Sequence, residues 1–131
     1  MVFIDSNVPM YLVGTAHPNK ADAQRRLEGL VTERVRLVTD AEVFTEILHR
    51  YTTIERRGSI QPALDALLGV VDEVLPMDRD TVERAKQLVL QYPSLPVRAA
   101  LHVAAMQRHG IETVLSFDAA YDRIPGLTRL R

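Results

Sequence analysis

The sequence contains no cysteine, which excludes disulfides, zinc–thiolate sites and thiol nucleophiles. A chain without cysteine is expected by default in the cytoplasm. No apolar run approaches the ~20 residues that a membrane-spanning helix requires, so we expect no membrane partner. The first ten residues also lack the basic stretch and long apolar segment of a secretory signal.

Neither sign of charge dominates the sequence. Sixteen basic and seventeen acidic side chains give a net charge of −1, so the overall field does not attract nucleic acid as a basic domain would. A polyanion such as RNA or DNA must therefore be bound by local clusters of arginine. Every basic residue except Lys20 and Lys86 is an arginine, whose planar fork is well suited to binding phosphate.

Several common catalytic motifs are absent. The sequence has no P-loop, no G-x-S-x-G and no H-E-x-x-H. Asp5-Ser6-Asn7 lacks the second aspartate of the D-x-D in aspartyl phosphatases, and no acidic pair ends the first predicted strand. A phosphatase or receiver-like function is therefore disfavoured.

Length and patterning predict one α/β domain over residues 1–131, since 47% hydrophobic and 25% charged residues are ordinary for a globular protein. Short apolar runs alternate with segments of helical periodicity, which favours a mostly parallel central sheet covered by helices. Strands are predicted at 1–4, 36–38, 74–76, 113–117 and 127–130. Helices are predicted at 7–13, 20–34, 41–58, 60–71, 79–91 and 97–109.

Residues with capping chemistry mark several of these boundaries. Thr39 or Asp40 is expected to cap the third helix and Ser59 the fourth. Asp78 or Asp80 is expected to cap the fifth, and Gly110 is the expected C-cap of the last.

Three acidic residues are candidates for a functional site. Asp5 and Asp118 each follow an apolar strand, and the functional crevice of a parallel sheet lies beyond the carboxyl ends of its strands. Glu46 lies among core-type residues of the third helix, so its carboxylate needs a partner. Taken singly, the two aspartates could be helix caps and Glu46 could pair with Arg50. Together, the three predict an oxygen-only site for Mg²⁺ or Mn²⁺.

Each polar residue near these acids has two possible roles. Ser6, Asn7 and Ser116 could orient the carboxylates and the bound water, or could serve only as turn and cap residues. Arg50 and Arg57 are predicted to share a helix face with Glu46, where they could contact phosphates or form a solvated face paired with Glu46 or Glu42.

Arg98 and two histidines also lie in segments near the acids. Arg98 could engage phosphate or an acid. His49 is expected to be a surface or core histidine, and His102, on an Ala/Val-rich helix, a packed structural residue.

Four segments and the end of the chain form an ordered series of motifs. They are Phe3-Ile4-Asp5-Ser6-Asn7, Thr45-Glu46-Ile47-Leu48, Arg98-Ala99-Ala100-Leu101-His102-Val103-Ala104, Ser116-Phe117-Asp118, and finally Tyr121-Asp122-Arg123-Ile124-Pro125-Gly126-Leu127. The series resembles the PIN-domain ribonucleases, specifically the VapC-type toxins of toxin–antitoxin pairs, over essentially the whole chain. The resemblance implies a three-layer α/β/α sandwich.

One position departs from the family pattern. The third motif of the family resembles R-D-A-x-H-x-A, and this chain has Ala99 where the pattern has aspartate. In the family, four acids hold one or two Mg²⁺ or Mn²⁺ ions that activate water for attack on an RNA phosphodiester. With only Asp5, Glu46 and Asp118 as ligands, we expect this chain to be inactive or impaired.

The resemblance also implies partners. These are an RNA substrate and a cognate antitoxin whose basic side chain enters the acidic cluster. The alternative function is a non-catalytic module that uses the same fold to bind RNA or an antitoxin, a possibility that Ala99 leaves open. A homodimer is expected because the apolar residues of the third and fourth helices exceed what one thin sheet can cover. Those residues are Phe44, Ile47, Leu48, Tyr51, Leu64, Leu67, Leu68 and Val71.

Overall fold

Five short strands form one parallel sheet in a computed structural model that describes all of residues 1–131. The strands are β1 (Val2–Ile4), β2 (Leu37–Asp40), β3 (Glu73–Leu75), β4 (Thr113–Leu115) and β5 (Thr128–Leu130). Their order across the sheet is β3-β2-β1-β4-β5, and every neighbouring pair is parallel. The predicted mostly parallel sheet is thus confirmed and is parallel throughout.

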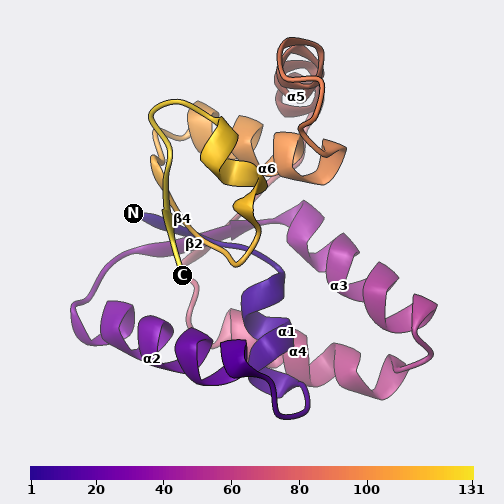
Figure 1. Ribbon diagram of the computed structural model, residues 1–131, viewed down its shortest axis with the longest axis vertical. Helices are drawn as coiled ribbons and strands as arrows, with labels where there is room; N and C mark the ends of the chain where they lie inside the picture. Colours follow the sequence, from indigo (N-terminus) through magenta and orange to yellow (C-terminus); the bar gives the residue numbers. More distant parts are fainter.

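Helices cover both faces of this sheet (Figure 1). They are α1 (Asn7–Val13), α2 (Pro18–Thr32), α3 (Ala41–Thr53), α4 (Ile60–Leu68), α5 (Arg79–Gln91) and α6 (Val97–Arg108), with the short 3₁₀ turns η1 (Arg57–Ser59) and η2 (Ala119–Arg123). Helices α1, α2 and α4 lie on one side of the sheet, and α5 and α6 lie on the other. The three-layer α/β/α arrangement is therefore confirmed. No helix is both long enough and apolar enough to cross a membrane.

The core is centred on two strands, β1 and β2, that are buried along their whole length. All three residues of β1 and all four of β2 are buried, as expected for parallel strands covered on both faces. In α6, small side chains such as Ala100 and Ala104 are fully buried. Because alanine takes little space, α6 can lie close to its neighbours, and this brings its first turns up to the strand ends.

The sheet has a topological switch point beside β1. From β1 the chain passes to β2 and then β3 on one side, whereas β4 and β5 lie on the other side of β1. Crevices open at the carboxyl ends of strands where the order reverses in this way. Asp5 follows β1 and Ser116 follows β4, so the fold places both residues at this point.

Some predicted helix boundaries were wrong. Helix α3 ends at Thr53 rather than near Gly58, because Glu55 adopts a left-handed conformation with φ of 58°. Arg57 consequently lies in η1 and does not share a helix face with Glu46. Ser59 forms no side-chain cap, since η1 runs directly into α4.

Two other predicted caps are confirmed. Asp40 accepts a hydrogen bond from the amide of Val43 at 3.0 Å, and Asp78 accepts one from the amide of Thr81 at 3.0 Å. The C-cap of α6 is His109 rather than the expected Gly110, which follows it with a positive φ of 67°, a conformation that glycine adopts readily.

The apolar residues of α3 and α4 are mostly accounted for within the chain. Ile47, Tyr51 and Leu67 are buried, because α4 packs on α1 and α3 packs on both α4 and α6. Leu48 and Leu68 are the exceptions, with 46% and 51% of their surface exposed. Neighbouring helices, as well as the sheet, cover these residues, so the apolar excess is smaller than the sequence suggested.

Candidate metal-binding and active site

Asp5 is held rigidly at the end of β1 and is only 4% exposed. Its Oδ1 accepts a hydrogen bond from the Ser6 amide at 2.8 Å, and its Oδ2 accepts one from the Ser116 hydroxyl at 2.6 Å. The side-chain amide of Asn7 also donates to Oδ2, at 3.4 Å. Burial raises the pKa of Asp5, and the nearby His102 and the Ser116 hydrogen bond offset this only in part.

Glu46 reaches the same point from α3. Its Oε2 accepts a hydrogen bond from the Ser6 hydroxyl at 2.6 Å, and its Oε1 is hydrogen-bonded to Nε2 of His102. It forms no ion pair with Arg50, so the alternative pairing considered from the sequence does not occur. Burial alone would raise the pKa of Glu46, but its interactions with His102 outweigh burial and lower it.

His102 and Asp40 complete a buried polar network that sequence reasoning missed. His102, from α6, is 1% exposed, and its Nδ1 lies 2.7 Å from Oδ2 of the fully buried Asp40. Burial lowers the pKa of His102, yet its hydrogen bonds to Asp40 and Glu46 prevail and raise it well above its ordinary value. His102 was expected to be packed, as it is, and Asp40 to be a cap, as it is. The two residues are 62 positions apart, so no local sequence pattern predicts their contact.

Asp118 joins the site through Ser116. Its amide donates to the Ser116 hydroxyl at 3.0 Å, and its Oδ1 caps η2 by accepting from the Ala120 amide at 2.9 Å. Its Oδ2 lies 3.7 Å from a guanidinium nitrogen of Arg98, whose side chain is 61% exposed. Asp118 therefore performs the capping role considered for it while also facing the site.

A cavity of about 370 Å³ gathers the predicted residues. Its lining includes Asp5, Ser6, Asn7, Glu46, Arg50, Arg98, Ala99, His102 and Asp118. Ala99 is the third residue of α6, so the fold brings the position that differs from the family pattern to the wall of the acidic cavity. Ser116 is fully buried behind Asp5, where it orients that carboxylate.

Tyr121 is a second residue that sequence reasoning did not single out for the site. It is 1% exposed and lines the cavity from η2. Burial, together with the charges of Asp5 and Glu46, raises its pKa well above the ordinary tyrosine value. Tyr121 therefore remains neutral and can act as a hydrogen-bond donor at the floor of the site.

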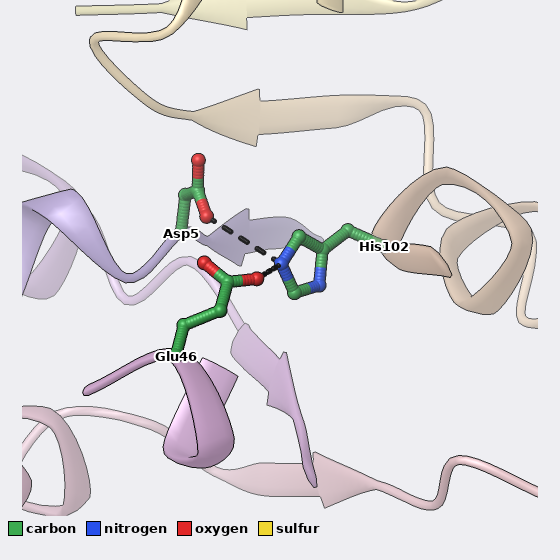
Figure 2. Close-up of side chains that lie close together, drawn as sticks. All are labelled: Asp5, Glu46 and His102. Atoms are coloured by element: carbon green, nitrogen blue, oxygen red, sulfur yellow. Dashed lines mark hydrogen bonds and ion pairs between the residues drawn. The ribbon is translucent and has the colours of Figure 1, made fainter. Parts of the chain in front are cut away.

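The cluster at the cavity floor fits a divalent cation. Asp5, Glu46 and His102 each present one ligand atom, and the three atoms lie within 4.8 Å of one another. Figure 2 shows these side chains converging from three different elements. The sequence predicted ligands that were oxygen only, whereas the structure adds an imidazole nitrogen to the group. Asp118 lines the same cavity but is not one of these three.

A second cavity continues from the first. Asn7, Met10 and Arg50 line both, and the second extends past Tyr51 to Arg56. The acidic cluster is thus at one end of a longer surface depression that carries arginines along it.

Comparison with known proteins agrees with this arrangement. The PIN-domain family profile matches residues 2–127. Ribonuclease VapC13 of Mycobacterium tuberculosis is 55% identical over 130 residues, which are 99% of each chain. The chain belongs to the VapC group of the PIN-domain family. Ribonuclease VapC23 of the same species is 36% identical over 118 residues, covering 90% of this chain and 93% of VapC23.

Solved structures share the fold at lower sequence identity. VapC20 of M. tuberculosis, described as a toxin that cleaves the sarcin–ricin loop, superposes with a TM-score of 0.70 at 21% identity, covering 91% of each chain. VapBC2 of Rickettsia felis, bound to a DNA fragment from its promoter, gives 0.74 at 16% identity, covering 99% of this chain and 98% of the other. These structures confirm the fold expected for a VapC protein.

Proposed function

We propose that this chain is a toxin of the VapC type whose acidic cavity is built for divalent-metal-dependent endonucleolytic cleavage of RNA. The observation that carries the proposal is the convergence of Asp5, Glu46 and Asp118 on one cavity from separate elements. Membership of the VapC group supports ribonuclease chemistry, since the two mycobacterial relatives are both named ribonucleases.

The proposed roles follow from the geometry. Asp5, Glu46 and Asp118 would hold Mg²⁺ or Mn²⁺. Such an ion lowers the pKa of a bound water molecule and neutralises the charge that develops on the phosphate. Ser6 and Ser116 orient the carboxylates through hydrogen bonds of 2.6 Å each. Asn7 links Asp5 to Ser116, because its amide reaches both.

Two exposed arginines are placed to meet the substrate. Arg50 stands at the junction of the two cavities, and Arg98 lies beside Asp118. We propose that both contact backbone phosphates of RNA, which positions the strand without reading its sequence. Their charges also offset the repulsion between the acidic cavity and the polyanion.

Ala99 limits this activity in the chain as it stands. A methyl group occupies the position where the family pattern has a carboxylate, so one negatively charged ligand is lost from the cavity wall. The same substitution favours the second candidate function, a non-catalytic module that binds RNA or an antitoxin through an intact fold.

Restoring the carboxylate separates the two candidate functions. We expect Ala99→Asp to bind Mn²⁺ more tightly and to cleave structured RNA orders of magnitude faster than the unaltered chain. EDTA or a further Asp5→Ala change should abolish that cleavage. Ala99→Asn is the matched control, since it has nearly the same shape without the charge. Equal cleavage by the aspartate and asparagine forms would mean that position 99 is not a ligand site. Silence of both across a broad RNA panel would favour the binding module.

An antitoxin is the proposed protein partner. VapBC2 of R. felis, the VapBC of Salmonella typhimurium and a toxin–antitoxin complex from Klebsiella pneumoniae share this fold, which supports the assignment. Because clustered carboxylates repel one another without a cation, we propose that a lysine or arginine of the antitoxin enters the cavity. Unchanged antitoxin binding by the double variant Asp5→Asn and Asp118→Asn would overturn that contact.

We also propose a homodimer and a cytoplasmic location. Exposed Leu48 and Leu68, on the packed helices α3 and α4, are the apolar residues left for a second copy to cover. Sedimentation of the chain without antitoxin at micromolar concentration tests this, and a monomer mass would overturn it. The cytoplasm follows from the proposed substrate, because cellular RNA is found there.

A further inference from the structure

His102 points a ring nitrogen at both carboxylates of the metal cluster. Its Nε2 is hydrogen-bonded to Glu46 and lies 3.8 Å from Oδ1 of Asp5 (Figure 2). The ring is 1% exposed and tilts against Phe3, with centroids 5.3 Å apart. Packing therefore prevents the ring from turning away from the cluster.

Asp40 determines which nitrogen faces the cluster. Its Oδ2 lies 2.7 Å from Nδ1 of His102, and its Oδ1 is occupied by the amide of Val43 at 3.0 Å. Asp40 is fully buried and does not line the cavity, so it can orient the ring but is not placed to be a ligand. A carboxylate that holds one histidine nitrogen while the other binds metal is the usual outer support of metal-ligating histidines.

The spacing of the three ligand atoms suits one ion. Ligands at about 2.1 Å from an ion stand about 3 Å apart when adjacent and about 4.2 Å apart when opposite. The separation of 3.8 Å between His102 and Asp5 lies between these two values, and all three atoms lie within 4.8 Å of one another, so a small adjustment brings them round one ion. Glu46 must withdraw slightly from His102, and its carboxylate lines the cavity rather than the core.

His102 also stands one helical turn beyond Ala99, and both residues line the cavity. Helix α6 thus presents an imidazole next to the position that lacks a carboxylate. Because position 99 supplies no carboxylate, Nε2 of His102 is one of a smaller number of available ligand atoms.

We propose that Nε2 of His102 is a metal ligand together with Asp5 and Glu46, and that this mixed site prefers first-row transition-metal dications such as Mn²⁺ over Mg²⁺. Imidazole suits transition metals, whereas an oxygen-only set suits Mg²⁺. To ligate a metal, His102 would have to be neutral, and the proton that it shares with Glu46 would leave to solvent. This inference rests on the metal site of the proposed function and specifies its chemistry.

Mn²⁺ added to the unaltered chain tests the nitrogen ligand directly. We expect pulsed electron paramagnetic resonance to detect ¹⁴N coupling to bound Mn²⁺, and the coupling to change to that of ¹⁵N when the histidines carry ¹⁵N. This measurement needs no substitution in the core and no RNA cleavage. Mn²⁺ bound without nitrogen coupling would overturn the inference and leave the metal site standing, whereas no Mn²⁺ binding would overturn both.

His49 provides the matched control, because it is the only other histidine that lines the cavity. The nitrogen coupling should persist in His49→Gln and disappear in His102→Gln. Coupling that disappears in His49→Gln would overturn the assignment to His102. Because His102→Gln could fail to fold, His49→Gln with ¹⁵N labelling decides the matter alone.

Competition between Mn²⁺ and Mg²⁺ tests the proposed preference. We expect Mn²⁺ to bind the unaltered chain at least 100-fold more tightly than Mg²⁺, and this ratio to fall in Ala99→Asp, where a further carboxylate joins the site. A ratio near one in the unaltered chain would overturn the preference.

Discussion

The hydroxyl of Ser116 donates a 2.6 Å hydrogen bond to Oδ2 of Asp5, across 111 residues of sequence. The same oxygen of Ser116 accepts from the side chain of Asn7 at 3.1 Å and from the amide of Asp118 at 3.0 Å. One buried hydroxyl thereby joins the carboxyl ends of β1 and β4 and sets the separation of two of the acids.

Ser116→Ala should weaken both the fold and the metal site. The change removes one hydrogen bond from each of three polar groups, and we expect the free energy of unfolding to fall by about 1–3 kcal/mol. Mn²⁺ affinity should fall by about tenfold or more, because residues that orient ligands commonly have such effects. Urea unfolding and Mn²⁺ titration measure the two effects. Ser94→Ala, at an exposed serine, should change neither, and full Mn²⁺ affinity in Ser116→Ala would contradict the orienting role.

Arg50→Gln should weaken binding of RNA. Arg50 is exposed where the two cavities meet, so its loss should lower the affinity for labelled RNA hairpins several-fold. The slope of the logarithm of affinity against the logarithm of salt concentration should become shallower by about 0.7. Fluorescence anisotropy in EDTA at several salt concentrations measures both without cleavage. Arg25→Gln is the control, since Arg25 lies on α2 and pairs with Asp22. Equal losses in the two variants would indicate only a general charge effect.

Stability should depend on pH through Asp122. Its two carboxylate oxygens each lie 2.9 Å from the guanidinium of Arg129, and this interaction lowers the pKa of Asp122. A depressed pKa stabilises the fold at pH values above the ordinary value of 3.8, and the contribution is lost as pH falls through the folded-state pKa. Unfolding in urea should show Asp122→Asn less stable than the unaltered chain at pH 7 and pH 5, with the difference shrinking towards pH 3. A difference that stays constant down to pH 3 would exclude the charge as its source.

Two leucines of α5 should respond differently to truncation. Leu88 is 1% exposed and Leu90 is 75% exposed, although they are two residues apart on one helix. Leu88→Ala should lower the free energy of unfolding by about 2–5 kcal/mol by leaving a cavity. Leu90→Ala should change it by less than about 0.5 kcal/mol. Similar losses in urea unfolding would mean that α5 does not pack as described.

Local pattern was sufficient to predict much of the site. Asp5 and Asp118 each follow an apolar run, and parallel strands end at one edge, so their approach could be inferred without coordinates. Glu46 could be inferred because a carboxylate between core residues of one helix must face a partner rather than open water. Position 99 was found from the motif order and does line the cavity.

Errors arose where a backbone conformation or a distant neighbour decided the outcome. Arg57 does not share a helix face with Glu46, because the left-handed conformation of Glu55 ends α3 before Arg57. A glutamate gives no indication in the sequence that its backbone is left-handed. The apolar excess of α3 and α4 was overestimated because neighbouring helices cover Ile47, Tyr51 and Leu67, and helix–helix contacts cannot be read from one segment.

The sequence by itself determined the alternation of short buried strands with amphipathic helices, and the residue types available to the site, including the missing carboxylate at Ala99. Tertiary structure decided which groups the carboxylates meet. His102 reaches Asp40 across 62 residues and Glu46 across 56, distances in sequence at which no local periodicity applies. The order of the strands and the packing of α6 create those contacts, so the position of the imidazole nitrogen beside Asp5 and Glu46 is a property of the fold.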